Sequence, residues 1–132
     1  TYWAIVKNLP PKENDTLTHF LKRNPKNNTS KAHSKEVPES KKASLEYTII
    51  KKLDNYFALE INLHTGRYHQ IRAQLAAIGC PIKGDLKYGF DRSNPDGGIH
   101  LHARKLVFVH PVSKEPLSII APVPDDVIWK AI

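Results

Sequence analysis

Residues 57–81, FALEINLHTGRYHQIRAQLAAIGCP, join a strand pattern directly to a helix pattern. In residues 57–63 large apolar side chains alternate with alanine, glutamate and asparagine. This alternation predicts a strand with one face on a core and the other on solvent or a partner. The apolar face holds Phe57, Leu59, Ile61 and Leu63.

The helix pattern begins near Arg67, with Thr65 as its predicted N-cap. Ile71, Leu75 and Ile78 form one apolar stripe at helical spacing. Gly79 followed by Pro81 predicts the end of the helix, because glycine adopts the left-handed C-cap conformation and proline cannot continue a helix.

Strand patterns surround this unit on both sides. Residues 45–63 predict a hairpin whose two-residue turn is Asp54-Asn55, residue types that tolerate the positive φ of such a turn. Residues 2–6 predict an opening strand, and residues 99–111 and 116–122 predict two more, with Pro111 and Pro122 marking their ends. The expected fold class is therefore α+β, an antiparallel or mixed sheet with a central short helix, in one domain over residues 1–132.

Residues 22–42, KRNPKNNTSKAHSKEVPESKK, show no apolar periodicity and contain seven basic and two acidic residues. This composition predicts a long mobile loop, which is either a solvated surface loop or an arm that grasps RNA.

Composition limits the function classes. The net charge of +7 favours an anionic partner such as RNA, although basic residues also serve solubility alone. There is no apolar run of about 18 residues, which argues against a membrane span, and no signal peptide pattern opens the chain. The single cysteine, Cys80, fits a reducing cytoplasm. Because residue 1 is not Met and already belongs to a strand pattern, the chain is expected to be a piece of a longer protein.

The predicted helix carries polar groups at its front: Arg67, His69, Gln70 and Arg72. Arg72 directly follows Ile71 at the margin of the apolar stripe, so its head is expected to be half-buried and to need a carboxylate or phosphate partner. Arg67, His69 and Gln70, near a helix N-terminus, suit phosphate groups or base edges.

Several other chemistries are not supported. Residues 84–89, GDLKYG, lack the spacing of a phosphate-binding loop, and no serine stands in an elbow motif. No metal site is expected. His64 and His69 are separated by a strand-to-helix turn, His100 and His102 fit side chains on one face of a strand, and Cys80 has no second cysteine as a companion. Asp54 is explained by the hairpin turn and is not expected to be catalytic.

The segment HTGRYHQIR, followed by GCPIKGDLKYG, resembles the RluA-type family of RNA pseudouridine synthases. Members of that family show TGR-x-HQIR, a short helix, and then G-x-PI-x-GD-x-x-YG. The resemblance continues in Leu101-His102-Ala103, His110-Pro111 and Ala121-Pro122, and Tyr2 with Ala4 resembles the family's Tyr-x-Ala strand. It covers most of the chain outside residues 22–42 and implies part of the pseudouridine synthase catalytic fold.

One departure concerns the catalytic acid. The family's nucleophilic aspartate lies in an HRLD-x-x-TSG segment that precedes the Tyr-x-Ala strand, and residues 1–132 contain no such segment. The resemblance implies that this aspartate attacks the base or the sugar of a uridine flipped out of RNA, without metal or organic cofactor. Arg72 is implied as its ion-pair partner and Tyr2 as the residue that stacks on the base. Arg72 could instead form a structural ion pair with Asp85, and Tyr2 could be an ordinary strand aromatic.

The sequence therefore predicts a fragment of a cytoplasmic RNA uridine isomerase that acts on ribosomal or transfer RNA and is inactive without its nucleophile. A non-catalytic RNA-binding module derived from the same fold is the alternative. A metal-dependent hydrolase is a weaker one.

Overall fold

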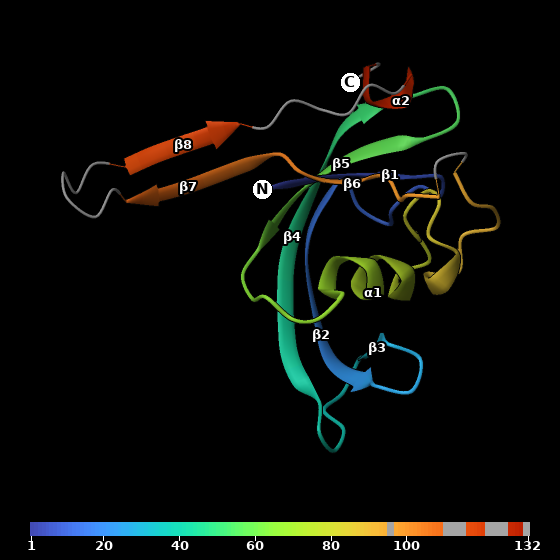
Figure 1. The fold of residues 1–132 in the computed structure, drawn as a ribbon, viewed down its shortest axis with the longest axis vertical. Coiled ribbons are helices and arrows are strands. Elements are labelled where there is room, and N and C mark those ends of the chain that lie inside the picture. The colour runs from blue at the N-terminus through green and yellow to red at the C-terminus, as the bar shows by residue number, and fades with distance from the viewer. Residues whose placement is uncertain (95–96, 110–115, 121–126, 131–132) are drawn as a thin grey trace.

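The computed structural model is described for residues 1–94, 97–109, 116–120 and 127–130. Its main body is a six-stranded sheet with the order β3-β2-β4-β5-β1-β6, in which every neighbouring pair is antiparallel (Figure 1). The strands are β1 (Tyr2–Val6), β2 (Asn14–Asn24), β3 (Thr29–His33), β4 (Lys41–Lys52), β5 (Phe57–Leu63) and β6 (Leu101–Ala103).

A separate antiparallel pair, β7 (Lys105–Val109) and β8 (Pro116–Ile120), extends away from the main sheet (Figure 1). The chain also forms the helix α1 (Gln70–Ala77), the 3₁₀ turn η1 (Leu86–Tyr88) and the short helix α2 (Val127–Lys130). The α+β fold class with an antiparallel sheet and a short helix is confirmed. Among the described helices, none is long and apolar enough to span a membrane.

The main core lies between one face of the sheet and α1 (Figure 1). Leu59 and Ile61 from β5 are fully buried there with Leu75 from α1, and Phe57 and Leu63 pack at the edge of the same cluster. The apolar face predicted for residues 57–63 is confirmed. The opposite face is not simply solvated, because Ala58 is buried on that side against Ile5 of β1 and Trp129 of α2.

The helix α1 begins at Gln70, later than the predicted start near Arg67. Its N-cap is His69, in the left-handed conformation with φ 53°, so the predicted capping role of Thr65 is wrong. The predicted end is confirmed: Gly79 adopts φ 81°, and Cys80 N–H donates to the Leu75 carbonyl at 2.9 Å.

Gln74 ties α1 to the sheet. Its side chain is fully buried, and its amide nitrogen lies 3.3 Å from the carbonyl oxygens of Leu17 on β2 and Ala43 on β4. A buried amide that donates to two neighbouring strands fixes where the helix sits on the sheet.

The loop predicted for residues 22–42 is wrong. These residues contain the end of β2, all of β3 and the start of β4, and they are joined by turns at 25–28 and 34–40. Lys22 pairs with Lys31 and Arg23 with Ser30 in the β2–β3 ladder. Period-2 patterning is weak here because the inner face of β3 carries only the small residues Ser30 and Ala32, which pack toward α1. Backbone pairing with β2 supplies the order instead.

The hairpin of β4 and β5 is confirmed, and Leu53 N–H donates to the Tyr56 carbonyl at 2.8 Å across Asp54-Asn55. Neither turn residue has a positive φ, so that detail of the prediction is wrong: the non-glycine residues with positive φ in the described chain are Asn28, Glu39 and His69. The run predicted as one strand over 99–111 is divided between β6 and β7, which belong to different sheets. Both Pro111 and Pro122, the predicted strand ends, lie outside the described residues.

Candidate active site

Arg72 is held in a two-pronged ion pair by Asp85. Its Nε donates to Asp85 Oδ2 at 2.9 Å, and its Nη2 donates to Oδ1 at 2.8 Å. The Asp85 side chain is 1% exposed and that of Arg72 is 20% exposed. The structural ion pair that the sequence left open is therefore present. The hydrogen bonds to Asp85 raise the pKa of Arg72 further above its ordinary value, so the guanidinium stays charged.

Asp85 is held in place by the turn that contains it. Its N–H donates to the Ile82 carbonyl at 3.0 Å, and its carbonyl accepts from the N–H groups of Tyr88 and Phe90. The preceding Gly84 has φ 88°, and a Cβ there would lie 2.5 Å from Asn94 Nδ2. Only glycine fits this position, so Gly84 allows the chain directly before Asp85 to pack closely against Asn94 and the Gly98 carbonyl.

His69 fixes a further edge of Arg72. Arg72 Nη1 lies 3.2 Å from His69 Nε2, and His69 Nδ1 lies 2.8 Å from the Tyr88 hydroxyl. Because a guanidinium only donates, Nε2 is the acceptor, and the ring proton lies on Nδ1 and points to Tyr88. The Tyr88 oxygen also accepts from Ser30 N–H at 2.9 Å. A network of hydrogen bonds thus runs from Ser30 on β3 through Tyr88 on η1 to His69 at the start of α1.

Three of the five N–H groups of Arg72 are used by Asp85 and His69 in the described part of the chain. One N–H on Nη1 and one on Nη2 remain as donors. A second carboxylate can therefore accept from Arg72 beside the position that Asp85 already occupies.

Tyr2 lies on the same face of the sheet as α1. It pairs with Ile61 on β5 and Ala103 on β6, and its ring is partly buried against the main core cluster. Its neighbour Trp3 packs on the opposite face, as the alternation of a strand requires. Tyr2 and Arg72 therefore belong to one side of the molecule, on different elements.

The residues predicted to contact RNA have different surroundings. Arg67 is exposed, and its Nε donates to the Lys42 carbonyl at 3.0 Å. Gln70 is 3% exposed: its Oε1 accepts from Thr65 Oγ1 and Arg67 N–H, and its Nε2 donates to the Ser44 carbonyl. Gln70 therefore fixes the turn before α1 and does not present its amide to a ligand, which corrects its predicted role. Both ring nitrogens of His69 are engaged as described above.

Sequence reasoning missed Tyr68, Ser30 and Arg23. The Tyr68 ring stacks on His69 with centroids 4.0 Å apart, and Arg23 Cζ lies 4.0 Å from the Tyr68 centroid. Ser30 Oγ donates to the Tyr68 carbonyl at 2.7 Å. No local signal could reveal the contacts of Tyr68 with Arg23 and Ser30, because both partners lie about 40 positions away, in the segment predicted as a loop.

The histidines considered for metal binding lie in separate surroundings. His64 Nδ1 is 3.0 Å from Ser44 Oγ, whereas His100 is buried beside Asn94 and the Trp129 ring. Within the described residues, no three side chains of metal-binding type gather at one point.

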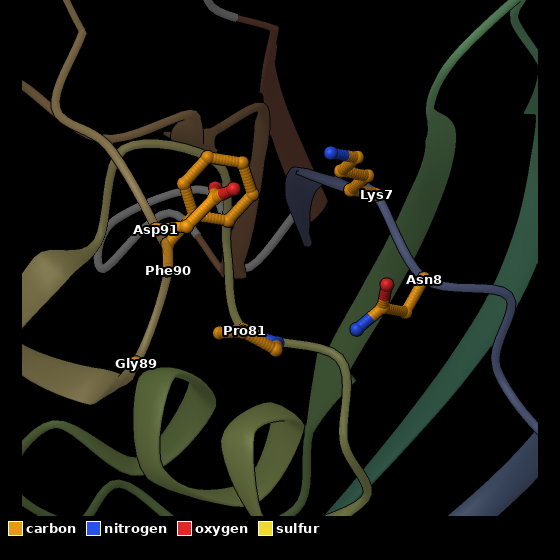
Figure 2. A pocket seen from close by; sticks show the side chains of 6 residues that line it. All are labelled: Lys7, Asn8, Pro81, Gly89, Phe90 and Asp91. Atoms are coloured by element: carbon orange, nitrogen blue, oxygen red, sulfur yellow. The ribbon is translucent and has the colours of Figure 1, made fainter.

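A small pocket of about 200 Å³ lies at the other end of β1 (Figure 2). It lies between the segment after β1, which supplies Lys7 and Asn8, and the segment that carries Phe90 and Asp91 (Figure 2). Asn8 Nδ2 donates to the Gly79 carbonyl at 2.7 Å. None of the five predicted site residues lines this pocket, so it is not the candidate site.

The stability of the fold is expected to depend on pH through His69. Burial and the charges of Arg72 and Lys87 lower the pKa of His69 below 6.5. The folded state therefore binds fewer protons than the unfolded state, and the stabilisation is present above about pH 6.5 and is lost as pH falls below it. Burial lowers the pKa of His19 as well, so His19 adds to the same slope.

Urea denaturation at pH 7.5 and 5.0 measures this effect. The loss of stability between the two pH values is expected to be smaller in His69→Gln than in the unsubstituted protein, and unchanged in the control His64→Gln, an exposed position. Equal losses in His69→Gln and the unsubstituted protein would contradict the assignment.

Comparison with known proteins agrees with the fold. The sequence model of the RNA pseudouridylate synthase family matches residues 1–77. An uncharacterized RNA pseudouridine synthase of Chlorobaculum parvum is 35% identical over 142 residues, which cover 95% of this chain and 43% of that protein. Ribosomal large subunit pseudouridine synthase D of Xylella fastidiosa is 39% identical over 99 residues, which cover 65% of this chain and 30% of that protein.

Among solved structures, human RNA Pseudouridylate Synthase Domain Containing 1 matches with a TM-score of 0.75 at 24% identity, over 98% of this chain and 56% of that chain. This likeness shows a shared fold. The chain belongs to the RNA pseudouridylate synthase family. It spans less than half the length of the two curated relatives named above.

Proposed function

We propose that the full-length protein containing this chain is an RNA pseudouridine synthase that isomerises a uridine of ribosomal or transfer RNA in the cytoplasm. Family membership supports the reaction type. The name of the Xylella fastidiosa relative supports ribosomal RNA as the substrate class. The observation that carries the proposal is Arg72, held by Asp85 and His69 with one N–H on each Nη left as a donor for a second carboxylate.

In the proposed reaction the second carboxylate is the nucleophilic aspartate, supplied from outside residues 1–132. A uridine leaves the RNA stack and is placed beside Arg72 and Tyr2. The aspartate attacks, the glycosidic bond breaks, the uracil rotates, and a carbon–carbon bond to the ribose replaces the carbon–nitrogen bond. The C5 proton of uracil is released to solvent, N1 takes up a proton from solvent, and the aspartate is regenerated. The atoms of the product are those of the substrate, so no co-reactant is required.

The residues of this chain prepare that step. Arg72 keeps the nucleophile ionised and oriented, because a planar guanidinium donates charge-assisted hydrogen bonds to carboxylate oxygens in a fixed geometry. Asp85 and His69 stop the arginine from rotating, which keeps its remaining donors pointing in one direction. Tyr2, on the face of the sheet that also carries α1, stacks on the target base in this proposal.

The test compares two proteins on RNA labelled with tritium at the uracil 5-position. The full-length protein is expected to release tritium and form pseudouridine, whereas residues 1–132 alone are expected to form none, because they lack the HRLD-type segment. Pseudouridine formation by residues 1–132 alone would contradict the assignment of the nucleophile. If the full-length protein binds RNA but forms no pseudouridine, the non-catalytic RNA-binding module becomes the better interpretation.

A further inference from the structure

A groove of about 240 Å³ lies between the β2–β3 hairpin and the turn that leads into α1. We name it the β2–α1 groove. Its lining residues are Leu21, Arg23, Ser30, Glu39, Lys41, Gly66, Arg67 and Tyr68. It adjoins the candidate active site, because Tyr68 stacks on His69, and His69 contacts Arg72.

Tyr68 holds Arg23 in this groove through a cation–π contact. The guanidinium carbon lies 4.0 Å from the centre of the Tyr68 ring, and the ring of His69 lies 4.0 Å from the same centre. Two groups at this distance cannot share one face of a ring, so Tyr68 is sandwiched between them. A base therefore cannot stack on Tyr68 unless Arg23 leaves. The N–H edges of a stacked guanidinium remain available to an anion.

Arg67 is held on the other side of the groove. Its Nε donates to the Lys42 carbonyl at 3.0 Å, which keeps its head beside the start of β4. Lys41 adds a third positive charge, and Glu39 is the one acidic side chain among the described lining residues. Two fixed guanidinium groups and an ammonium provide the donor geometry that phosphate oxygens accept.

The basic surface continues beyond the groove. A second hollow of about 410 Å³ shares Arg23 and Glu39 with it and adds Lys22 and Lys31 from the β2–β3 ladder. The hairpin is fixed to the turn before α1 by the hydrogen bond from Ser30 to Tyr68, so these charges keep a set position relative to Arg72. A chain of phosphates, unlike a single anion, can contact both hollows together.

We propose that the β2–α1 groove binds the sugar–phosphate backbone of the substrate RNA beside the target uridine, with Arg23 and Arg67 as the principal phosphate ligands. This inference rests on the proposed function for the identity of the polyanion. The groove sets the position of the strand through phosphate contacts and does not select its sequence.

The experiment measures the affinity of the full-length protein for its RNA as a function of salt concentration. Arg23→Ala and Arg67→Ala are each expected to weaken binding several-fold and to reduce the slope of log K against log salt by about 0.7–0.9, the contribution of one phosphate contact. Lys52→Ala is the matched control, because it removes one exposed positive charge at the other end of β4, about 35 Å from Lys41. It is expected to leave the slope unchanged.

Two variants separate a built site from a general positive charge. Tyr68→Leu keeps the net charge but removes the ring that holds Arg23, so it is expected to weaken binding, whereas Tyr68→Phe keeps the ring and is expected to bind normally. Glu39→Gln removes the carboxylate from the groove and is expected to strengthen binding. Circular dichroism checks that each variant is folded.

Unchanged binding in both Arg23→Ala and Glu39→Gln would overturn the proposal, and so would an equal loss in Lys52→Ala and Arg23→Ala. The rate of pseudouridine formation at saturating RNA tests the proposed function separately. If that rate is zero while Arg23→Ala still reduces the salt slope, the proposed function fails and the RNA groove stands.

Discussion

Replacing Asp85 by asparagine is expected to lower the free energy of unfolding by about 3 kcal/mol, the lower end of the range for breaking a buried ion pair. The Asp85 side chain is 1% exposed and accepts two hydrogen bonds from Arg72. Asparagine has nearly the same shape, but it removes the negative charge and places its amide N–H group opposite an N–H group of Arg72. Because Arg72 is partly exposed, water solvates some of its uncompensated charge, and this keeps the loss of unfolding free energy at the lower end of that range.

Chemical denaturation of the full-length protein measures this effect, with Asp91→Asn as the control. Asp91 is an exposed carboxylate six residues further along the same segment, and its replacement is expected to change the free energy by less than about 0.5 kcal/mol. A double-mutant cycle with Arg72→Gln isolates the pair itself. An Asp85→Asn protein as stable as the unsubstituted one would show that the ion pair does not stabilise the fold.

The substitution Arg72→Lys is expected to slow pseudouridine formation by about 10- to 150-fold in the full-length protein. Lysine keeps the charge, but its ammonium cannot bind Asp85, His69 and a second carboxylate in the planar geometry of a guanidinium. A lost charge-assisted hydrogen bond corresponds to roughly 1.5–3 kcal/mol, and the expected change in rate follows if that loss is expressed in the transition state.

Single-turnover kinetics at saturating RNA measure the chemical step, with Arg67→Lys as the matched control. Arg67 lies in the β2–α1 groove. A lysine there still attracts phosphate as a point charge but loses the two-pronged geometry of a guanidinium, so RNA binding is expected to weaken. The rate at saturating RNA is expected to stay nearly unchanged. A slower chemical step in Arg67→Lys than in Arg72→Lys would mean that the two arginines have the opposite roles. Thermal unfolding of both variants separates a loss of rate from a loss of structure.

The strand and helix patterns predicted the fold well where one face of an element is apolar. In β5, Leu59 and Ile61 lie on either side of Glu60, which is strand spacing. In α1, Leu75 follows Ile71 at helical spacing. Burial of these residues therefore decides the type of each element and which of its faces points to the core. The prediction for residues 22–42 failed because β3 has no face of large apolar residues: Thr29, Lys31 and His33 alternate with Ser30 and Ala32. Their order comes from backbone pairing with β2 and β4, which apolar periodicity does not report.

Sequence patterns alone predicted the α+β class, a hairpin over residues 45–63, the helix stop at Gly79 and the resemblance that family membership confirms. These features depend on short-range chemistry or on an ordered motif. The packing of the folded chain, in contrast, brings Asp85 to one edge of Arg72, buries Gln70 and places Arg23 against Tyr68. Each of these contacts joins segments that the chain separates, and its geometry depends on how strands and turns pack together, which sequence spacing does not specify.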